Sequence, residues 1–144
     1  MKQPQISVVS PVFGAEKIVP ELVDRLEVQL KTLGCDYEVI LVDDGSPDQS
    51  WRAIETASGK SPRLKGIRLS RNFGQHHAIA TGLDHAMGEW VVVLDCDLQD
   101  PPEAVIELWS KRTPGVDAVF ANRVGSYTSA GRHLSSMVYR RAAS

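Results

Sequence analysis

Short apolar runs alternate with longer amphipathic stretches along this chain of 144 residues. The runs are rich in valine, leucine and isoleucine and have the length of strands that are buried on both faces. The stretches between them repeat apolar residues every three or four positions, most clearly from Leu22 to Leu33, which is typical of helices packed on a sheet. The predicted strands cover residues 6–9, 37–42, 64–69, 90–94 and 116–121, and the predicted helices cover about 19–33, 49–58, 76–86, 101–111 and 128–141.

The alternation of strands and helices predicts the α/β class, with a Rossmann-like, mostly parallel sheet flanked by helices. At this length the chain forms one domain. Polar groups follow four of the predicted strands, at residues 11–14, 43–44, 95–97 and 122–123. In such sheets ligands bind at the carboxyl ends of the strands, where the strand order reverses. We therefore expect these polar groups to converge on one edge of the sheet.

Two carboxylates, Asp95 and Asp97, directly follow the apolar run at 90–94. Carboxylates this close repel one another unless a cation lies between them, and Mg²⁺ and Mn²⁺ prefer such hard oxygen ligands. Gln99 could add its carbonyl oxygen. A solvated acidic turn is the alternative, but the position at a strand end, opposite a second acidic loop, favours a metal.

A helix should begin just after this turn, and it accounts for the next acidic residues. Asp100 is placed as its N-cap, Pro101 suits the first helical position, and Glu103 stands where the partner in a capping box belongs. Asp100 and Glu103 therefore have a sufficient structural explanation.

The second acidic loop follows the second strand. Turn chemistry explains its glycine and Asp48, which would cap the next helix, and it is also the alternative explanation of Asp44, but the adjacent acids Asp43 and Asp44 exceed what a turn needs. Carboxylates can accept hydrogen bonds from ribose hydroxyls or from a base edge. The chain has no Gly-x-Gly-x-x-Gly and no Walker loop, so the phosphates of a bound nucleotide would be neutralised by a metal and by arginines.

Basic residues near the end of the chain are candidates for binding a phosphate. Arg123 follows the last predicted strand and could bind a phosphate through two parallel hydrogen bonds, or be solvated. Arg132 and Ser136 are four residues apart in the predicted helix at 128–141, so they share a face that could hold a phosphate or be merely polar. Cys96, between the two carboxylates, is expected to pack rather than react.

Composition narrows the class further. A net charge of −2 gives no reason to expect nucleic-acid binding. No run of about 18 apolar residues occurs, so no membrane-spanning segment is predicted. The two cysteines, Cys35 and Cys96, have neither a zinc nor a redox spacing.

Four stretches, at residues 7–13, 42–48, 71–75 and 94–103, resemble the ordered motifs of glycosyltransferase family 2. The last two, with Asn-Phe-Gly-Gln and Asp-x-Asp-Leu-Gln, are similar to the branch of dolichyl- and undecaprenyl-phosphate hexosyltransferases. The resemblance implies a GT-A fold, with residues 1–144 as one nucleotide-sugar-binding catalytic domain truncated at its C-terminal end.

The resemblance also implies an activity. It implies inverting, metal-dependent transfer of a hexose from a donor of the UDP-glucose or GDP-mannose type to a polyprenyl phosphate, with Mg²⁺ or Mn²⁺ as cofactor. Such an enzyme would act at the membrane surface, on the cytoplasmic face, and could be a homo-oligomer.

Roles for individual residues follow from the same resemblance. Asp97 and Arg123 would be catalytic, and Asp95, Asp97 and Gln99 would hold the metal and the diphosphate. The substrate-binding residues would be Pro11, Phe13 and Glu16 for the base, Val42 and Asp44 for the nucleoside, Arg132 and Ser136 with Arg123 for the lipid phosphate, and also Gln75 and Cys96. The chain departs from the family pattern at Gly14 and Ala15, where an asparagine and an acid are usual.

Two other functions stay open. One is transfer to a saccharide acceptor, which would need a catalytic carboxylate from another region, and the other is a non-catalytic module that binds a nucleotide-sugar. A phospho-receiver domain does not fit, because it needs its acid pair after the first strand and a lysine at the end of the fifth. Here the pair follows the second strand, and Asn122 and Arg123 follow the fifth.

Overall fold

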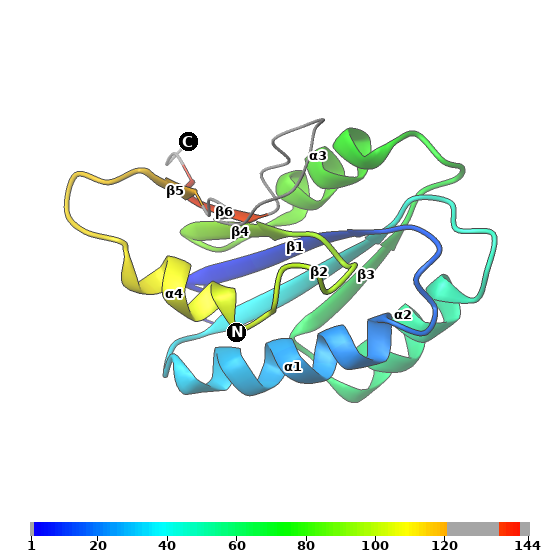
Figure 1. Ribbon diagram of the computed structural model, residues 1–144, viewed down its shortest axis with the longest axis horizontal. Helices are drawn as coiled ribbons and strands as arrows, with labels where there is room; N and C mark the ends of the chain where they lie inside the picture. Colours follow the sequence, from blue (N-terminus) through cyan, green and yellow to red (C-terminus); the bar gives the residue numbers. More distant parts are fainter. Residues whose placement is uncertain (1, 121–135, 142–144) are drawn as a thin grey trace.

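The computed structural model describes residues 2–120 and 136–141, which form one six-stranded sheet with helices on both faces (Figure 1). Within these residues, none of the helices combines the length and the apolar character that crossing a membrane requires. The elements in chain order are β1 (Ile6–Val12), α1 (Val19–Thr32), β2 (Tyr37–Asp43), α2 (Ser50–Lys60), β3 (Leu64–Arg68), α3 (Gln75–His85), β4 (Trp90–Leu94), α4 (Ala104–Ser110), β5 (Ala118–Phe120) and β6 (Ser136–Arg140).

The strand order is β3-β2-β1-β4-β6-β5. β1 pairs in parallel with β2 and with β4, and β2 pairs in parallel with β3. The predicted α/β fold with a mostly parallel sheet is therefore confirmed. Because β2 lies on one side of β1 and β4 on the other, the strand order reverses at β1, and a ligand-binding crevice is expected above β1 and β4.

The helix predicted at 128–141 is wrong where the structure describes it, because residues Ser136–Arg140 form strand β6, antiparallel to both β4 and β5; residues 128–135 lie outside the described residues. Val138 is fully buried between neighbours that are less buried, which is a strand pattern with a period of two. Pairing with β4 also satisfies the backbone groups along an edge that would otherwise be open. Ser136 therefore lies in a strand and not on a helix face with Arg132, which lies outside the described residues.

The start of α4 also differs from its prediction. The helix begins at Ala104, and Glu103 is its N-cap residue without a side-chain capping bond, so Asp100 is not the N-cap and there is no capping box. Glu103 instead accepts hydrogen bonds from Nε of Arg25 at 3.1 Å and from Nη2 at 2.7 Å. A guanidinium binds a carboxylate more strongly than a single backbone N–H does. The hydrogen bonds from Arg25 hold the pKa of Glu103 below its ordinary value.

The loop before α2 brings the carboxylate of Asp48 to the first turn of the helix. The Oδ1 atom of Asp48 accepts a hydrogen bond from the backbone N–H of Ser50 at 3.0 Å, at the start of the helix. Asp48 thus binds a backbone N–H of the first turn as a capping residue would, but the N-cap position itself is occupied by Gln49, which makes no side-chain capping bond. The Oδ2 atom of Asp48 also accepts the backbone N–H of Glu16 at 3.3 Å, which joins the loop after β1 to the loop after β2.

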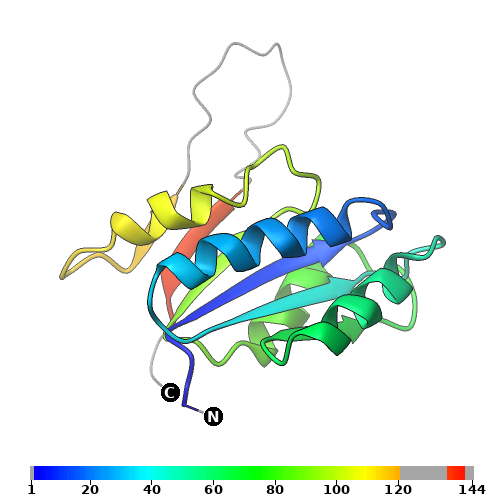
Figure 2. The ribbon, with the colours of Figure 1, turned by 90° about the horizontal axis from the view of Figure 1, so that it is seen from below.

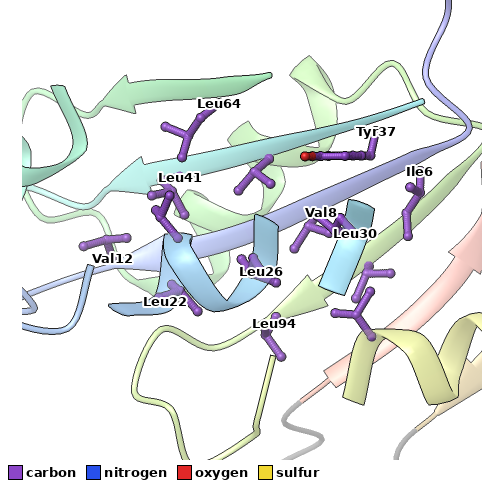
Figure 3. Packing of buried hydrophobic residues seen from close by; sticks show 14 of the residues in the cluster. Ile6, Val8, Val12, Leu22, Leu26, Leu30, Tyr37, Leu41, Leu64 and Leu94 are labelled. Carbon is purple, nitrogen blue, oxygen red and sulfur yellow. The ribbon is translucent and has the colours of Figure 1, made fainter. Parts of the chain in front are cut away.

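Helices α1, α2 and α4 cover one face of the sheet, and α3 covers the other (Figures 1 and 2). Leu22, Leu26 and Leu30 of α1 lie in one fully buried cluster with Val8 and Val12 of β1 (Figure 3). Val9 of β1, which points to the opposite face, belongs to a second buried cluster beneath α3. Both faces of the central strands are therefore covered, which explains why their sequences are continuously apolar rather than alternating.

Small residues hold α3 close to the sheet. Ala78 and Gly82 are the buried residues of this helix. A Cβ atom on Gly82 would lie 2.3 Å from Cγ1 of Val9 and 3.2 Å from Cγ2 of Val42. Only glycine permits this approach, so the sheet fixes the axis of α3 and also the position of its first residue, Gln75.

A buried carboxylate joins the amino ends of the strands, opposite the predicted ligand edge. Glu38 is 4% exposed, and its Oε1 atom accepts hydrogen bonds from Oγ of Ser7 at 2.6 Å and from the backbone N–H of Met87 at 2.7 Å. Its Oε2 atom lies 2.7 Å from Nζ of Lys65. Burial raises the pKa of Glu38, but these three hydrogen bonds outweigh it, so the pKa lies below the ordinary value.

Candidate active site

The carboxyl ends of β1, β2 and β4 meet at a cleft of about 360 Å³. This is the edge where the strand order reverses, and three of the four predicted polar groups contribute to it. The expected convergence is confirmed for these three, and the fourth, at residues 122–123, lies outside the described residues. The residues that line the cleft are Pro11, Val12, Phe13, Asp44, Asn72, Gly74, Gln75, Asp95, Cys96 and Asp97.

The two acids after β2 point in different directions. Asp44, which is 3% exposed, lines the cleft, and its carboxylate accepts the backbone N–H of Phe73 at 2.8 Å and that of Gly74 at 3.1 Å. Asp43 is fully buried on the other side, where Oδ1 accepts the N–H of Ser46 at 3.2 Å and Oδ2 lies 3.7 Å from Nε of Arg68. Neighbouring residues at a strand end face opposite sides, so only one acid of the pair belongs to the cleft.

The turn after β4 presents the second acidic pair. Nε2 of Gln75 donates a hydrogen bond to Oδ1 of Asp95 at 2.7 Å. Oδ1 of Asp97 accepts the backbone N–H of Gln99 at 3.0 Å, which closes a tight turn. Leu98, inside this turn, has a φ of 61°, a conformation that costs a leucine roughly 1–2 kcal/mol. Its side chain packs against the main buried cluster, which stabilises the strained turn.

The donor set suits a hard divalent cation. Asp95 and Asp97 both line the cleft, and Mg²⁺ is usually bound by one or two carboxylates together with water and substrate phosphates. Residues 2–120 and 136–141 contain no group of three histidine, cysteine, aspartate or glutamate side chains that could enclose a metal by themselves. Asp95 and Asp97 therefore offer two carboxylates to a cation at the cleft.

The aromatic side chain of Phe13 lines the cleft, and that of Phe73 lies between two lining residues in the sequence, Asn72 and Gly74. Phe13 is 52% exposed and Phe73 is 41% exposed, and the guanidinium of Arg71 lies 4.3 Å from the centre of the Phe73 ring. An exposed aromatic ring that lines a polar cleft, as Phe13 does, is suited to stacking on a flat ligand such as a base. Asn72 and Gly74 also line the cleft but were not predicted as site residues, although the motif at 71–75 was the signal that could have found them.

Other predicted site residues lie elsewhere. Glu16 lines a separate groove between α1 and α2, where its Oε2 atom accepts the N–H of Gln49 at 3.3 Å. The side chain of Val42 is fully buried beneath α3. Arg123 and Arg132 are outside the described residues, and Ser136 begins β6.

Cys96 lines the cleft but behaves as a packed thiol. It contacts the main buried cluster, as expected from the sequence. Burial raises the pKa of the Cys96 thiol, and the carboxylates of Asp97 and Asp95 add to this effect, whereas a hydrogen bond from the Phe13 backbone offsets part of it. The thiol therefore stays protonated near neutral pH and is a poor nucleophile.

The strand order, the helices on both faces and the acidic cleft at the reversal define a GT-A fold, which similar solved structures share. The chain belongs to the family described as glycosyl transferase family 2, whose sequence model matches residues 7–139. The family that the motifs resemble is thereby confirmed.

Two similar proteins come from strains of Klebsiella pneumoniae, and both are described as undecaprenyl-phosphate 4-deoxy-4-formamido-L-arabinose transferase. Each is 38% identical to the chain over 138 residues, which cover 95% of the chain and 42% of the relative. The chain thus spans less than half the length of these relatives.

Solved structures with a similar fold include the mannosyltransferase PcManGT from Pyrobaculum calidifontis in complex with GDP-Man and Mn²⁺. The comparison of this structure with PcManGT has a TM-score of 0.73 at 21% sequence identity, and the match covers 98% of this chain and 46% of PcManGT. The structure of S. aureus TarS 1–349 matches with a TM-score of 0.63 at 26% identity, over 94% of this chain and 47% of that protein.

Proposed function

We propose that this chain forms the donor-binding part of a glycosyltransferase that moves a sugar from a nucleotide-sugar to a polyprenyl phosphate, with inversion and with a divalent metal. The observation that carries the proposal is the cleft that brings together Asp44, Asp95 and Asp97 in a chain of glycosyl transferase family 2. The names of the Klebsiella relatives support undecaprenyl phosphate as the acceptor. The enzyme would work at the cytoplasmic face of a membrane.

The sugar is the least constrained part of the proposal. The motifs resemble those of hexosyltransferases, whereas the Klebsiella relatives are named for a modified arabinose, which is a pentose. UDP-linked and GDP-linked hexoses and a nucleotide-linked 4-formamido-arabinose are therefore all donors to be tested.

The nucleoside would bind at the ends of β1 and β2. Pro11 and Phe13 would flank the base, and Asp44 would accept hydrogen bonds from the ribose or the base edge. The carboxylate of Asp44 already accepts two backbone N–H groups, but its two oxygens have about four acceptor positions, so two stay available in chemical terms. These contacts would fix the carboxylate before the donor arrives.

The diphosphate would bind at the end of β4. Asp95 and Asp97, with Gln99, would hold Mg²⁺ or Mn²⁺, which when bound supplies positive charge against the diphosphate. The assignments of Arg123, Arg132 and Ser136 to the lipid phosphate, and of Glu16 to the base, stay predictions from the sequence.

The proposed reaction needs little proton transfer. A phosphate oxygen of the acceptor forms a bond to the anomeric carbon while the bond from that carbon to the diphosphate oxygen breaks, and the nucleoside diphosphate leaves with the electron pair. Attack from the opposite face inverts the configuration. A phosphate monoester is already an anion near neutral pH, so a dedicated general base is less necessary than for a sugar hydroxyl.

Calorimetric titration with UDP-sugars and GDP-sugars, with Mn²⁺ or with EDTA, tests donor binding. Asp97→Asn should weaken Mn²⁺-dependent binding by at least about tenfold, because even residues that only support metal ligands contribute tenfold or more to metal affinity. Asp84→Asn, at an exposed position of α3, is the matched control and should bind like wild type. Donor binding by Asp97→Asn that equals wild type would exclude the assignment.

Acceptor specificity needs a second assay. With labelled donor, transfer to undecaprenyl phosphate in detergent supports the proposal, whereas transfer only to oligosaccharides points to a saccharide acceptor. Donor binding without turnover on either acceptor indicates a non-catalytic binding module.

A further inference from the structure

The segment 71–75 joins the two acidic ends of the cleft. Its backbone N–H groups at Phe73 and Gly74 are both bound by the carboxylate of Asp44, at 2.8 and 3.1 Å. The carboxylate of Asp44 is almost fully buried, so this double contact is partly shielded from water. The segment is thus held firmly against the end of β2.

The backbone of segment 71–75 also packs closely against the turn after β2, at Gly45. Gly45 has a φ of 69°, and a Cβ atom at this position would lie 2.4 Å from the backbone N of Asn72 and 2.5 Å from the backbone C of Arg71. The turn after β2 therefore needs glycine both for its own conformation and for this contact. The motif at 71–75 and the Asp-Gly pair after β2 are two halves of one packed arrangement.

The next residue in the chain reaches the other acidic end. Gln75 is the first residue of α3, and its Nε2 atom lies 2.7 Å from Oδ1 of Asp95. The position of Gln75 is well determined, because the preceding residues are bound to Asp44 and the following helix is packed on the sheet through Gly82. The carboxylate of Asp95 is thereby oriented from a rigid element.

The group that donates the hydrogen bond to Asp95 is an uncharged side-chain amide. A lysine or arginine beside Asp95 would neutralise the carboxylate and compete with a cation for it. The amide of Gln75 is neutral, so it can orient Asp95 and leave its negative charge in place. Groups that orient a metal ligand in this way typically contribute about tenfold to hundredfold to metal affinity.

We propose that Gln75 is a positioning residue, which fixes the carboxylate of Asp95 toward the divalent cation and diphosphate of the donor. This inference rests on the proposed function. It assigns Gln75 a role through Asp95, beyond general contact with the substrate, and it makes segment 71–75 a link between the nucleoside and diphosphate halves of the cleft.

Gln75→Met tests this inference, since methionine has nearly the length of glutamine and a similar helix propensity but cannot donate the hydrogen bond. His76→Met, at the exposed neighbouring position in the first turn of α3, is the matched control. Mn²⁺ is titrated into each chain with UDP or GDP present, and free Mn²⁺ is followed by electron paramagnetic resonance. Binding of UDP and GDP in EDTA and the Tm of the metal-free chain are measured in parallel.

Gln75→Met should weaken Mn²⁺ binding by about tenfold, with its Tm and its nucleotide binding in EDTA unchanged, and His76→Met should match wild type throughout. Wild-type Mn²⁺ affinity in Gln75→Met overturns the inference and leaves the proposed function intact. The inference is also overturned if Gln75→Met lowers the Tm and weakens nucleotide binding in EDTA along with Mn²⁺ binding, because Gln75 would then have only a structural role. A wild-type chain that binds neither Mn²⁺ nor either nucleotide overturns both proposals.

Discussion

Glu38→Gln should destabilise the fold without changing the cleft, because Glu38 lies at the opposite ends of the strands. The glutamine can keep its oxygen toward Ser7 and Met87, but its NH₂ group then faces the ammonium of Lys65, and that hydrogen bond is lost. Hydrogen bonds to charged groups contribute about 1.5–3 kcal/mol each. Lys65 is 46% exposed and can turn to water, so we expect a loss of about 2 kcal/mol.

The pH dependence provides a second signature of the same carboxylate. Its pKa is lower in the folded chain than the ordinary value of 4.5. The charged form therefore stabilises the fold fully above the unfolded pKa, and this contribution is lost as the pH falls through the folded pKa. The difference in stability between wild type and Glu38→Gln should thus be full at pH 7 and should shrink progressively below about pH 4.5.

Urea unfolding at several pH values measures both effects. At pH 7 a loss of about 2 kcal/mol corresponds to a Tm that is lower by roughly 6 °C for a chain of this size. Glu55→Gln removes the same charge from an exposed position of α2 and is the control, with little expected change. A Glu38→Gln chain within about 0.5 kcal/mol of wild type at pH 7, or a difference that persists undiminished at pH 3, would refute the reasoning.

Two further substitutions probe packing. Gly82→Ala should lower stability by about 1 kcal/mol, because the contact with Val9 at 2.3 Å costs about 1–3 kcal/mol and outweighs the gain in helix propensity of about 1 kcal/mol; a raised Tm would contradict the close packing of α3. Ser10→Ala should leave stability unchanged or raise it by up to about 1 kcal/mol, because the Ser10 hydroxyl is buried with no hydrogen-bond partner among the described residues. A lower urea midpoint for Ser10→Ala would reveal a partner for that hydroxyl.

The cleft was largely predictable because its parts follow strands that the apolar runs identify. The predicted strand at 90–94 matches β4, and the acids after it line the cleft. The rule that ligands gather at the carboxyl ends of parallel strands then brings Asp44 near Asp95 without knowledge of the side-chain contacts. What the rule could not provide is the hydrogen bond between Gln75 and Asp95, since it depends on how closely α3 approaches the sheet.

The predictions of the capping box and of the last helix are wrong because a contact with a residue distant in sequence overrides the local pattern. Glu103 has the spacing of a capping box, but Arg25, 78 residues away in sequence, binds it. Ser136–Arg140 was predicted within a helix, but the open edge of β4 makes it a strand. In both cases the decisive partner comes from another element, so periodicity and capping signals could not reveal it.

The sequence by itself determined the α/β class, the spans of the central elements and the family, because these depend on apolar periodicity and on short motifs that are local properties of the chain. The tertiary structure decided which acid of the pair after β2 enters the cleft, which strand lies beside β4 and which side chain orients Asp95. Those features depend on the packing of residues far apart in sequence, which only the folded chain brings within hydrogen-bonding distance.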